Sequence, residues 1–461
     1  MLSKRPFAIA VCCLVLLVSA CAEDATEPRP LDPALDAAAL SKGPNDSLAR
    51  VVRELTAGRG ITAMPRPPRV RSALSRLGQA LVFDKVLSGN RDISCMTCHL
   101  PVHGTSDGRS LSVGQGAAGL GPGRTHPAGV FIPRNAPPLF NLSTLTSLFW
   151  DGRVSRDAQG VFHTPAKEQL TPSMTQTLEF GAISALGLFP VLSRSEMRAD
   201  ADNELALIPD DRPDLIWGAL MQRLGRIREY RRMFERAYPG QRFEQMTFAH
   251  ASNAMAGFFL DRLSFNNSPW DRFLAGSNRA LTTQQLQGAN GFMRGRCSIC
   301  HNGPAFTDNQ FHNVAVAQIG PGQGDGADGR DDFGRMRETG LSTDQYRFRT
   351  TPLRNVELTA PYGHDGAIVS LREFIDHYSV SDAKLRSYDV NQLEPALRPT
   401  LLATADAILA TRDTLLNGVN LSAEVVDNLA AFMTALTDPA ARNLRRVTPR
   451  RVPSGLPVDK P

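Results

Sequence analysis

The chain has 461 residues, of which 42% are hydrophobic and 21% are charged, and its formal net charge is +5. This length is sufficient for two domains of ordinary size, each with its own core. The chain has no Lys/Arg-rich run with interleaved aromatic residues, and this argues against nucleic-acid binding.

Residues 1–21 have the features of a bacterial export signal. Lys4 and Arg5 precede an apolar run over residues 7–18, which is too short for a comfortable membrane span. The small residues before Cys21 are typical of a lipoprotein cleavage box, in which that cysteine becomes the lipidated first residue. An ordinary signal cleaved nearby is the alternative. The pattern predicts a periplasmic protein that is anchored to the membrane through a lipid on Cys21.

The next stretch, residues 22–68, is rich in Ala, Pro and Asp and predicts a flexible tether with a short leading helix. The first strongly periodic segment covers residues 72–83, where Leu74, Leu77 and Leu81 fall on one face. We therefore expect a helix there, packed by its leucine face.

Two copies of a Cys-x-x-Cys-His motif follow. They are Cys95, Cys98 and His99, and then Cys297, Cys300 and His301. Two cysteines at this spacing can both bond to the vinyl groups of a porphyrin, and the histidine directly after them is placed to ligate the iron. The alternative is a single zinc ion held by four thiolates, but zinc does not require a histidine after each pair. The motifs predict two covalently attached haem c groups.

The segments that follow the two motifs repeat each other. Pro138, Asn141 and Asp151 have the same mutual offsets as Pro352, Asn355 and Asp365. This repetition indicates an internal duplication of one haem-binding unit. It predicts two cytochrome c-like domains, an N-terminal one over residues 69–276 and a C-terminal one over residues 277–441.

Three further helices are expected. One has an apolar face over residues 251–259 and stops before Trp270. Thr282 and Gln285 form a capping box that opens a second helix running to Cys297.

The third helix covers residues 422–436 and has one apolar stripe. No alternating strand pattern is longer than a few residues, so the fold should be mainly α. The basic, proline-containing tail over residues 442–461 is expected to be disordered.

Together these motifs resemble the bacterial di-haem cytochrome c peroxidases, including the methylamine-utilisation (MauG-like) di-haem enzymes. The resemblance extends over about residues 74–436, and besides both haem motifs it rests on residues 149–153, 268–272 and 353–366. It implies that the first haem meets hydrogen peroxide and the second accepts electrons from a small periplasmic donor such as a cytochrome c or a cupredoxin.

Two other functions stay open at this point. One is a MauG-like oxidase that acts on an organic or protein substrate through a high-valent state. The other is a pure electron-transfer cytochrome with both irons six-coordinate. The resemblance also allows a homodimer, and it leaves the physiological donor and substrate unnamed.

The resemblance implies roles for three residues near the first haem. Trp150 matches the tryptophan between the two haems, with a plain core aromatic as the alternative. Glu196 matches the catalytic glutamate, which must move a proton when the O–O bond breaks. Gln115 stands where the peroxidases carry an iron-capping histidine. The first iron should therefore be open to peroxide, unless His103 or His126 substitutes.

On the second haem, Tyr378 falls at the position of the far iron ligand, which is methionine in the peroxidases and tyrosine in the MauG-like enzymes. His377 or a nearby methionine is the alternative. Tyrosinate stabilises ferric iron, whereas methionine raises the reduction potential.

One calcium ion is also implied by the resemblance. Asn135, Thr359 and Pro361 match the residues that bind it through one side chain and backbone carbonyls. The acidic stretch at residues 325–332 is a weaker candidate, and we expect it to be a solvated loop.

Overall fold

The computed structural model of the protein describes residues 44–460. The expected export signal, the lipid anchor on Cys21 and the first part of the tether lie outside these residues. Within residues 44–460 the strands are only two or three residues long and the rest of the regular structure is helical. The mainly α fold class is therefore confirmed. No helix of this part of the chain has the length and apolar character needed to cross a membrane.

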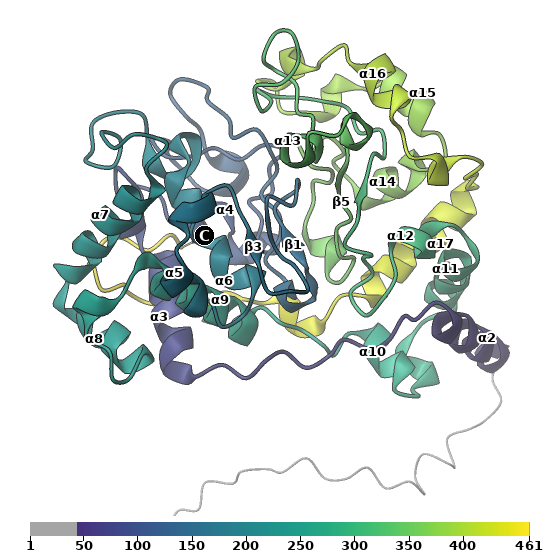
Figure 1. Cartoon of the computed structure of the whole chain (residues 1–461). Helices are drawn as coiled ribbons and strands as arrows, with labels where there is room; N and C mark the ends of the chain where they lie inside the picture. The colour runs from purple at the N-terminus through teal and green to yellow at the C-terminus, as the bar shows by residue number, and fades with distance from the viewer. Residues whose placement is uncertain (1–43, 461) are drawn as a thin grey trace, which may run out of the picture. The chain divides into compact units, whose positions relative to one another are not determined.

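The elements follow one another along the chain as shown in Figure 1. The α-helices are α2 (Pro44–Gly58), α3 (Ser72–Phe83), α4 (Cys95–Cys98), α5 (Pro172–Gln176), α6 (Ala182–Leu186), α7 (Pro213–Gly225), α8 (Arg228–Ala237), α9 (Phe248–Arg262), α10 (Pro269–Leu274), α11 (Thr283–Arg294), α12 (Cys297–Cys300), α13 (Met336–Thr339), α14 (Leu371–His377), α15 (Ser381–Arg386), α16 (Ala405–Ala410) and α17 (Ala423–Ala435). The strands β1 (Ser147–Leu148), β2 (Val154–Arg156) and β3 (Phe162–His163) form one antiparallel sheet, and β4 (Phe311–His312) pairs with β5 (Phe348–Arg349).

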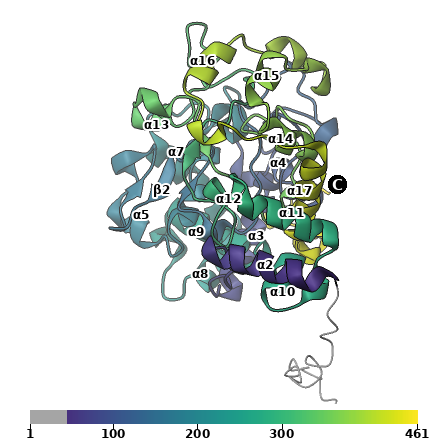
Figure 2. The same cartoon turned by 90° about the vertical axis from the view of Figure 1, so that its right-hand side faces the viewer.

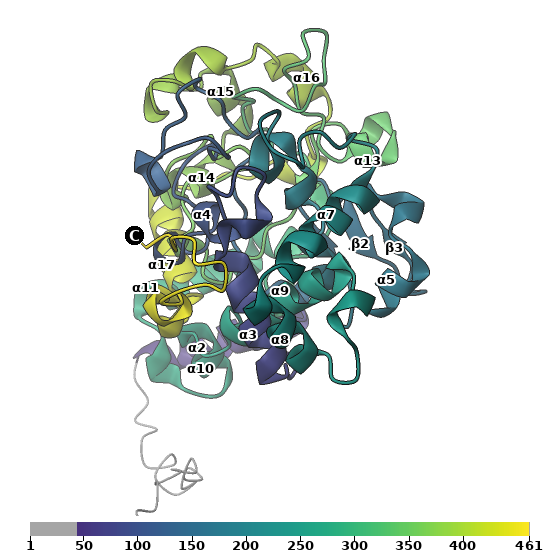
Figure 3. The same ribbon diagram turned by 90° about the vertical axis from the view of Figure 1, so that its left-hand side faces the viewer.

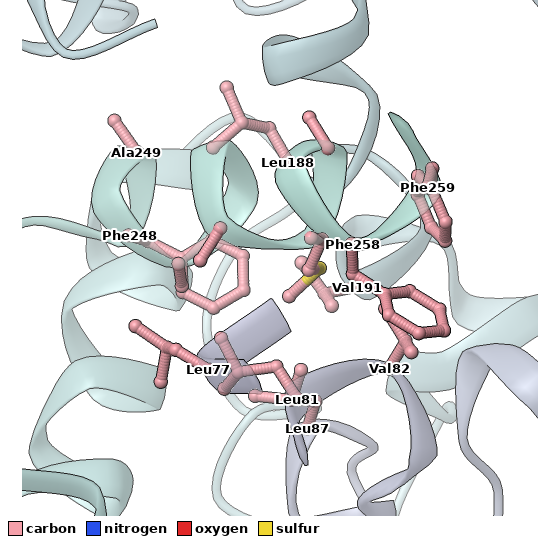
Figure 4. Close-up of a cluster of buried hydrophobic side chains, with 14 of the residues drawn as sticks. Leu77, Leu81, Val82, Leu87, Leu188, Val191, Phe248, Ala249, Phe258 and Phe259 are labelled. Carbon is pink, nitrogen blue, oxygen red and sulfur yellow. The ribbon is translucent and has the colours of Figure 1, made fainter. Parts of the chain in front are cut away.

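The first hydrophobic core forms where α3 packs against α9. Helix α3 begins and ends where the leucine periodicity predicts, and Leu77 and Leu81 are fully buried. Figure 4 shows these leucines facing Phe248 and Phe258 of α9. The short helix α4, which carries the first haem motif, packs against α3 and is therefore positioned by this core.

A second, separate core forms where α11 packs against α17. The predicted capping box is present, because the Thr282 hydroxyl accepts from the Gln285 N–H at 3.2 Å and the Gln285 side chain accepts from the Thr282 N–H at 2.9 Å. Helix α11 ends at Arg294 rather than running to Cys297. The chain leaves the helix in an extended conformation at Gly295, and the second motif forms its own short helix α12.

Both helix pairs cross at a glycine. A Cβ atom on Gly78 of α3 would lie 1.9 Å from the Ala254 carbonyl oxygen of α9, and one on Gly288 of α11 would lie 1.9 Å from the Asn428 carbonyl oxygen of α17. No side chain fits at such distances, so glycine allows each pair of backbones to approach closely.

This close approach makes Gly78→Ala a test of the first core. We expect the substitution to lower the free energy of unfolding by about 1–3 kcal/mol, because the methyl group forces α3 away from α9. The matched control is Gly218→Ala in α7, where a Cβ meets nothing within 4 Å. Alanine there should raise stability by about 0.5–1 kcal/mol. Chemical denaturation of the holoprotein measures both, and equal effects would contradict the close crossing.

The prediction of a disordered C-terminal tail is wrong for residues 442–460. Leu444, Val447 and Val452 are buried in the first core, and Figures 1 and 3 show the yellow end of the chain lying beside α3 and α4. The prediction was based on the basic residues and prolines of this segment. The apolar side chains between them reach the first core and are buried there.

Polar contacts also hold the tail. The Ser454 hydroxyl donates to Asp84 at 2.6 Å, Lys85 pairs with Asp459 at 2.6 Å, and the Thr97 hydroxyl donates to Asp459 at 2.5 Å. Since Thr97 lies within the first haem motif, the end of the chain is attached directly to that motif.

The second half of the predicted tether is also part of the fold. Helix α2 packs against α11, as Figure 2 shows, and Ile61 and Met64 are buried. The second core also takes in Trp270, which lies before the expected domain boundary at residue 276. Pro44–Pro461 forms one compact unit, so the boundary at 276 remains a prediction.

Candidate functional site

The first haem motif is held by a network of short-range hydrogen bonds. Ser94 and Thr97 cap α4, with the Ser94 N–H donating to the Thr97 hydroxyl at 2.9 Å. The ring of His99 lies with Nδ1 2.9 Å from the Thr105 carbonyl oxygen. Nδ1 therefore donates to that carbonyl, and Nε2 is left with the lone pair that a metal ligand needs.

The second haem motif repeats this arrangement. His301 Nδ1 lies 3.0 Å from the Phe306 carbonyl oxygen, five residues further along the chain. Burial lowers the pKa of both His99 and His301. Both imidazoles are accordingly neutral, which is the form that binds iron.

The four motif cysteines are free thiols. Cys95 and Cys98 pack against the first core and Cys297 packs against the second. Among the described residues, the only group of three or more His, Cys, Asp or Glu side chains that could share a metal is Cys300 with Asp308 and His312. Four thiolates therefore do not meet at one point, and the zinc alternative has no support.

A large cavity lies beside the second motif. Its lining includes His301, both thiols and many apolar side chains from α11, α14 and α17. Two arginines, Arg296 and Arg349, also line it, and none of the lining residues is Asp or Glu. A flat, apolar, negatively charged group with a metal that takes a histidine fits this lining, so the residues present fit a haem.

Tyr378 lines this cavity, and its role as a ligand of the second iron stays a prediction. Burial raises the pKa of Tyr378, and the thiols of Cys297 and Cys300 contribute to the shift. The alternative His377 is instead hydrogen-bonded through Nε2 to the Val314 carbonyl at 2.8 Å. A methionine, Met433, does reach the cavity wall.

Glu196 lies beside the first motif. It sits in a π-helical turn, Arg194–Arg198, a geometry that is frequent at functional sites. Burial raises the pKa of the Glu196 carboxyl, and the guanidinium of Arg153 opposes the shift. Burial likewise raises the pKa of Cys95 to about 12, and the charge of Glu196 adds to that shift, so the carboxylate is close to the thiol.

Gln115 belongs to the same corner of the molecule. Its N–H donates to the Glu196 carbonyl oxygen at 3.1 Å, and its side chain accepts from Asn90 at 2.5 Å. Of the two histidines considered as substitutes, His126 is the nearer to this loop, because its Nε2 lies 3.1 Å from where a Cβ on Gly116 would be.

Trp150 lines the second cavity although it belongs to the first half of the chain. Its indole Nε1 donates to the Asn135 carbonyl oxygen at 2.9 Å, and its own carbonyl accepts from the Arg349 N–H at 2.8 Å. Trp150 is 8% exposed, and these hydrogen bonds hold both its side chain and its backbone. The indole is therefore buried and oriented at the second cavity, and its position between the two haems stays a prediction.

The three expected calcium ligands come together at the same cavity. Asn135, Thr359 and Pro361 all line it. The Asn135 side-chain amide nitrogen donates to the Arg109 carbonyl oxygen at 2.8 Å, so the side-chain oxygen of Asn135 points away from that carbonyl. Calcium binding remains a prediction.

The acidic stretch at residues 325–332 is only in part the solvated loop that we expected, because residues 326–330 are exposed but the last two residues are not. Asp331 and Asp332 are buried. The Tyr346 hydroxyl donates to Asp331 at 2.7 Å, and Arg134 donates to both oxygens of Asp332 at 2.7 and 2.8 Å.

Arg134 is a residue that the sequence analysis missed. It also donates to Asp151 at 2.5 Å, and both carboxylates raise the pKa of Arg134 against the effect of burial. The resulting buried ion pairs fix the segment that carries Trp150 against the chain beyond the second motif. Arg134 and Asp332 are 198 positions apart, so no local sequence pattern could have revealed the pair.

Two short Cys-x-x-Cys helices, each followed by an oriented histidine and each placed by its own helical core, define a helical c-type cytochrome with two attachment sites. Residues 72–279 match the family model described as di-haem cytochrome c peroxidase. Over this part of the chain the protein is similar to the di-haem cytochrome c peroxidases, a family in which two c-type haems are implied.

Several relatives have this family's names. Cytochrome-c peroxidase IdrP2 of Denitromonas iodatirespirans is 27% identical, over 69% of this chain and 77% of the relative. Methylamine utilization protein MauG of Methylorubrum extorquens is 28% identical, over 66% of this chain and 67% of the relative. Cytochrome c551 peroxidase of Pseudomonas aeruginosa is 28% identical, over 65% and 69%.

Solved structures show the same fold. A MauG-like protein associated with microbial copper homeostasis has a TM-score of 0.58 and 24% identity, and the match covers 84% of this chain and 98% of that protein. The di-haem peroxidase BthA from Burkholderia thailandensis has a TM-score of 0.56 and 20% identity, with 81% and 88% covered.

Proposed function

We propose that this protein is a periplasmic di-haem peroxidase that reduces hydrogen peroxide with electrons from a small external donor, such as a cytochrome c or a cupredoxin. The observation that carries this proposal is the half-buried Glu196 side chain beside the first haem motif, where desolvation raises the pKa of its carboxyl. When bound, a haem iron supplies the site that binds peroxide and exchanges electrons.

Each side chain of the first site has a part in this proposal. His99 would hold the iron through Nε2. Glu196 accepts a proton from one peroxide oxygen and returns it to the other as the bond between them breaks. Gln115, which binds ferric iron poorly, would leave the iron open to peroxide. Trp150 lies on the route between the two sites.

His301 and Tyr378 would hold the iron of the second site, and this site would receive the electrons. Phenolate ligation favours ferric iron, which supports a MauG-like oxidase as the second candidate function. The presence of Tyr378 in the cavity is the specific observation in favour of that candidate.

Tyr378→Met tests this ligand. A thioether in place of the phenolate stabilises ferrous iron, so we expect a higher reduction potential for the second haem and an unchanged potential for the first. Potentiometric titration followed by visible absorption measures both. An unchanged second potential would remove Tyr378 from the iron, and Met433 would become the candidate ligand.

We infer an internal duplication from matched backbone geometry as well as from sequence offsets. Asn141 and Asn355 both have positive φ, 53° and 64°. In each case the asparagine N–H donates to one carbonyl and its side chain accepts from the N–H two residues beyond that carbonyl. Leu263 and Phe265 supply these groups to Asn141, and Leu436 and Asp438 supply them to Asn355. Two domains, residues 69–276 and 277–441, fit this repetition.

Other parts of the proposal rest on the sequence and on the family. They are the lipid anchor on Cys21, one calcium ion at Asn135, Thr359 and Pro361, and a homodimer. Export fits covalent haem attachment, which takes place outside the cytoplasm.

Two measurements test the proposed function. The ferric protein should give one high-spin and one low-spin haem signal in electron paramagnetic resonance, and it should oxidise reduced cytochrome c when peroxide is added. Two low-spin signals without turnover would favour the pure electron-transfer cytochrome. One high-spin signal without peroxide turnover would favour the MauG-like oxidase.

A further inference from the structure

Arg349 is a buried arginine in β5, at the wall of the second cavity, and only 6% of it is exposed. Its guanidinium makes two long hydrogen bonds, from Nε to the Phe149 carbonyl oxygen at 3.2 Å and from Nη1 to the Thr350 carbonyl oxygen at 3.4 Å. Burial lowers the pKa of Arg349 to about 10, and the charge of Asp151 opposes the shift. The cation is thus poorly compensated.

The other buried arginines of residues 44–460 are well compensated. They are Arg109, Arg124, Arg134, Arg198, Arg223 and Arg354. Five of them pair with a carboxylate. The sixth, Arg124, uses all three of its nitrogens, at 2.7 to 3.0 Å from carbonyl oxygens. Arg349 is the exception in the described chain, because no carboxylate pairs with it and its Nη2 has no hydrogen-bond partner.

A guanidinium buried without an anion is strongly destabilising, so the partner of Arg349 must be supplied from elsewhere. The cavity that Arg349 lines contains the thiols of Cys297 and Cys300, and its lining residues include no Asp or Glu. The missing carboxylate is therefore part of whatever fills this cavity.

We propose that Arg349 binds a propionate carboxylate of the haem attached at Cys297 and Cys300. This proposal rests on the proposed di-haem function. The guanidinium fork matches a carboxylate in two-point geometry. Its positive charge favours the iron state with the lower positive charge, so Arg349 raises the reduction potential of the second haem. Arg349 keeps its proton near neutral pH, and its positive charge keeps the paired propionate ionised there.

Arg349→Met removes the charge and approximately keeps the bulk. At about pH 8 we expect the oxidised form of the second haem to be favoured at least tenfold more than in the unmodified holoprotein, a potential lower by about 59 mV. At about pH 6 the shift should be smaller, because the unpaired buried propionate then takes up a proton. Potentiometric titration at both pH values measures this, and the first haem serves as an internal reference.

The matched control is Arg296→Met. Arg296 lines the same cavity but is exposed, so solvent screens its charge. We expect less than a threefold change from this control, and we expect Arg349→Lys to restore most of the potential. Equal shifts in Arg349→Met and Arg296→Met, or a shift that does not depend on pH, would overturn the proposal.

Two further readouts keep the test decisive. A pyridine haemochrome assay counts the covalent haems, and a count of one in the unmodified protein would overturn the di-haem function rather than the role of Arg349 alone. If Arg349→Met does not retain its second haem, the pH dependence of the second potential is measured in the unmodified protein instead. Its second potential should be constant between about pH 6 and pH 8, and a slope of one proton there would overturn the pairing.

Discussion

Replacing Glu196 by glutamine should lower the rate of peroxide turnover by about 10²–10⁴-fold, the usual contribution of a positioned acid–base group. Glutamine keeps the shape of the side chain but cannot carry the proton. Cyanide binding to the ferric protein should stay nearly intact, because it needs an open iron and no proton shuttle at this residue. Steady-state oxidation of reduced cytochrome c and a cyanide titration measure the two effects.

The pH dependence gives this prediction a second readout. Burial raises the pKa of Glu196 above its ordinary value of 4.5. The carboxylate form accepts the peroxide proton, so activity should fall as the pH drops through this raised pKa. The acid limb should be missing in Glu196→Gln. Glu168→Gln, an exposed glutamate in the same half of the chain, should leave both the rate and the pH profile unchanged. Unchanged turnover in Glu196→Gln would remove Glu196 from the mechanism.

The double variant Cys95→Ala/Cys98→Ala should lose the covalent haem of the first site completely. Without either thiol no thioether can form, and His99 alone holds a haem weakly. The pyridine haemochrome count should fall from two to one, the high-spin signal should disappear, and peroxide turnover should be abolished.

The mirror variant Cys297→Ala/Cys300→Ala provides the control. It should also retain one covalent haem, but it should lose the low-spin signal and keep the high-spin one. Two haems remaining in either double variant, on a denaturing gel stained for haem, would show that the motif concerned is not an attachment site.

Much of the fold was predictable from local patterns. The leucine spacing predicted both ends of α3, and the capping box at Thr282 predicted the start of α11. These features depend on residues within one or two helical turns of each other. The end of α11 was predicted three residues too far, because the motif at Cys297 forms a helix of its own.

The features that could not be predicted depend on partners far apart in the sequence. Asp332 is buried because Arg134 meets it, and neither residue reveals the other by spacing. Val447 and Val452 lie in the basic, proline-containing C-terminal tail. Their side chains are buried because they reach the first core, which is formed by residues far away in the sequence. The same holds for the site. The haem motifs are local and could be predicted, whereas the lack of a carboxylate partner for Arg349 among the described residues can be seen only in the three-dimensional structure.

The contact between Asp459 and Thr97 ties the last residues of the protein to its first haem motif. The first motif therefore depends on a segment that lies after the second core in the sequence, whereas α11 and α17 pack against each other without that segment. Changes at Asp459 should therefore be felt at the first motif and not at the second.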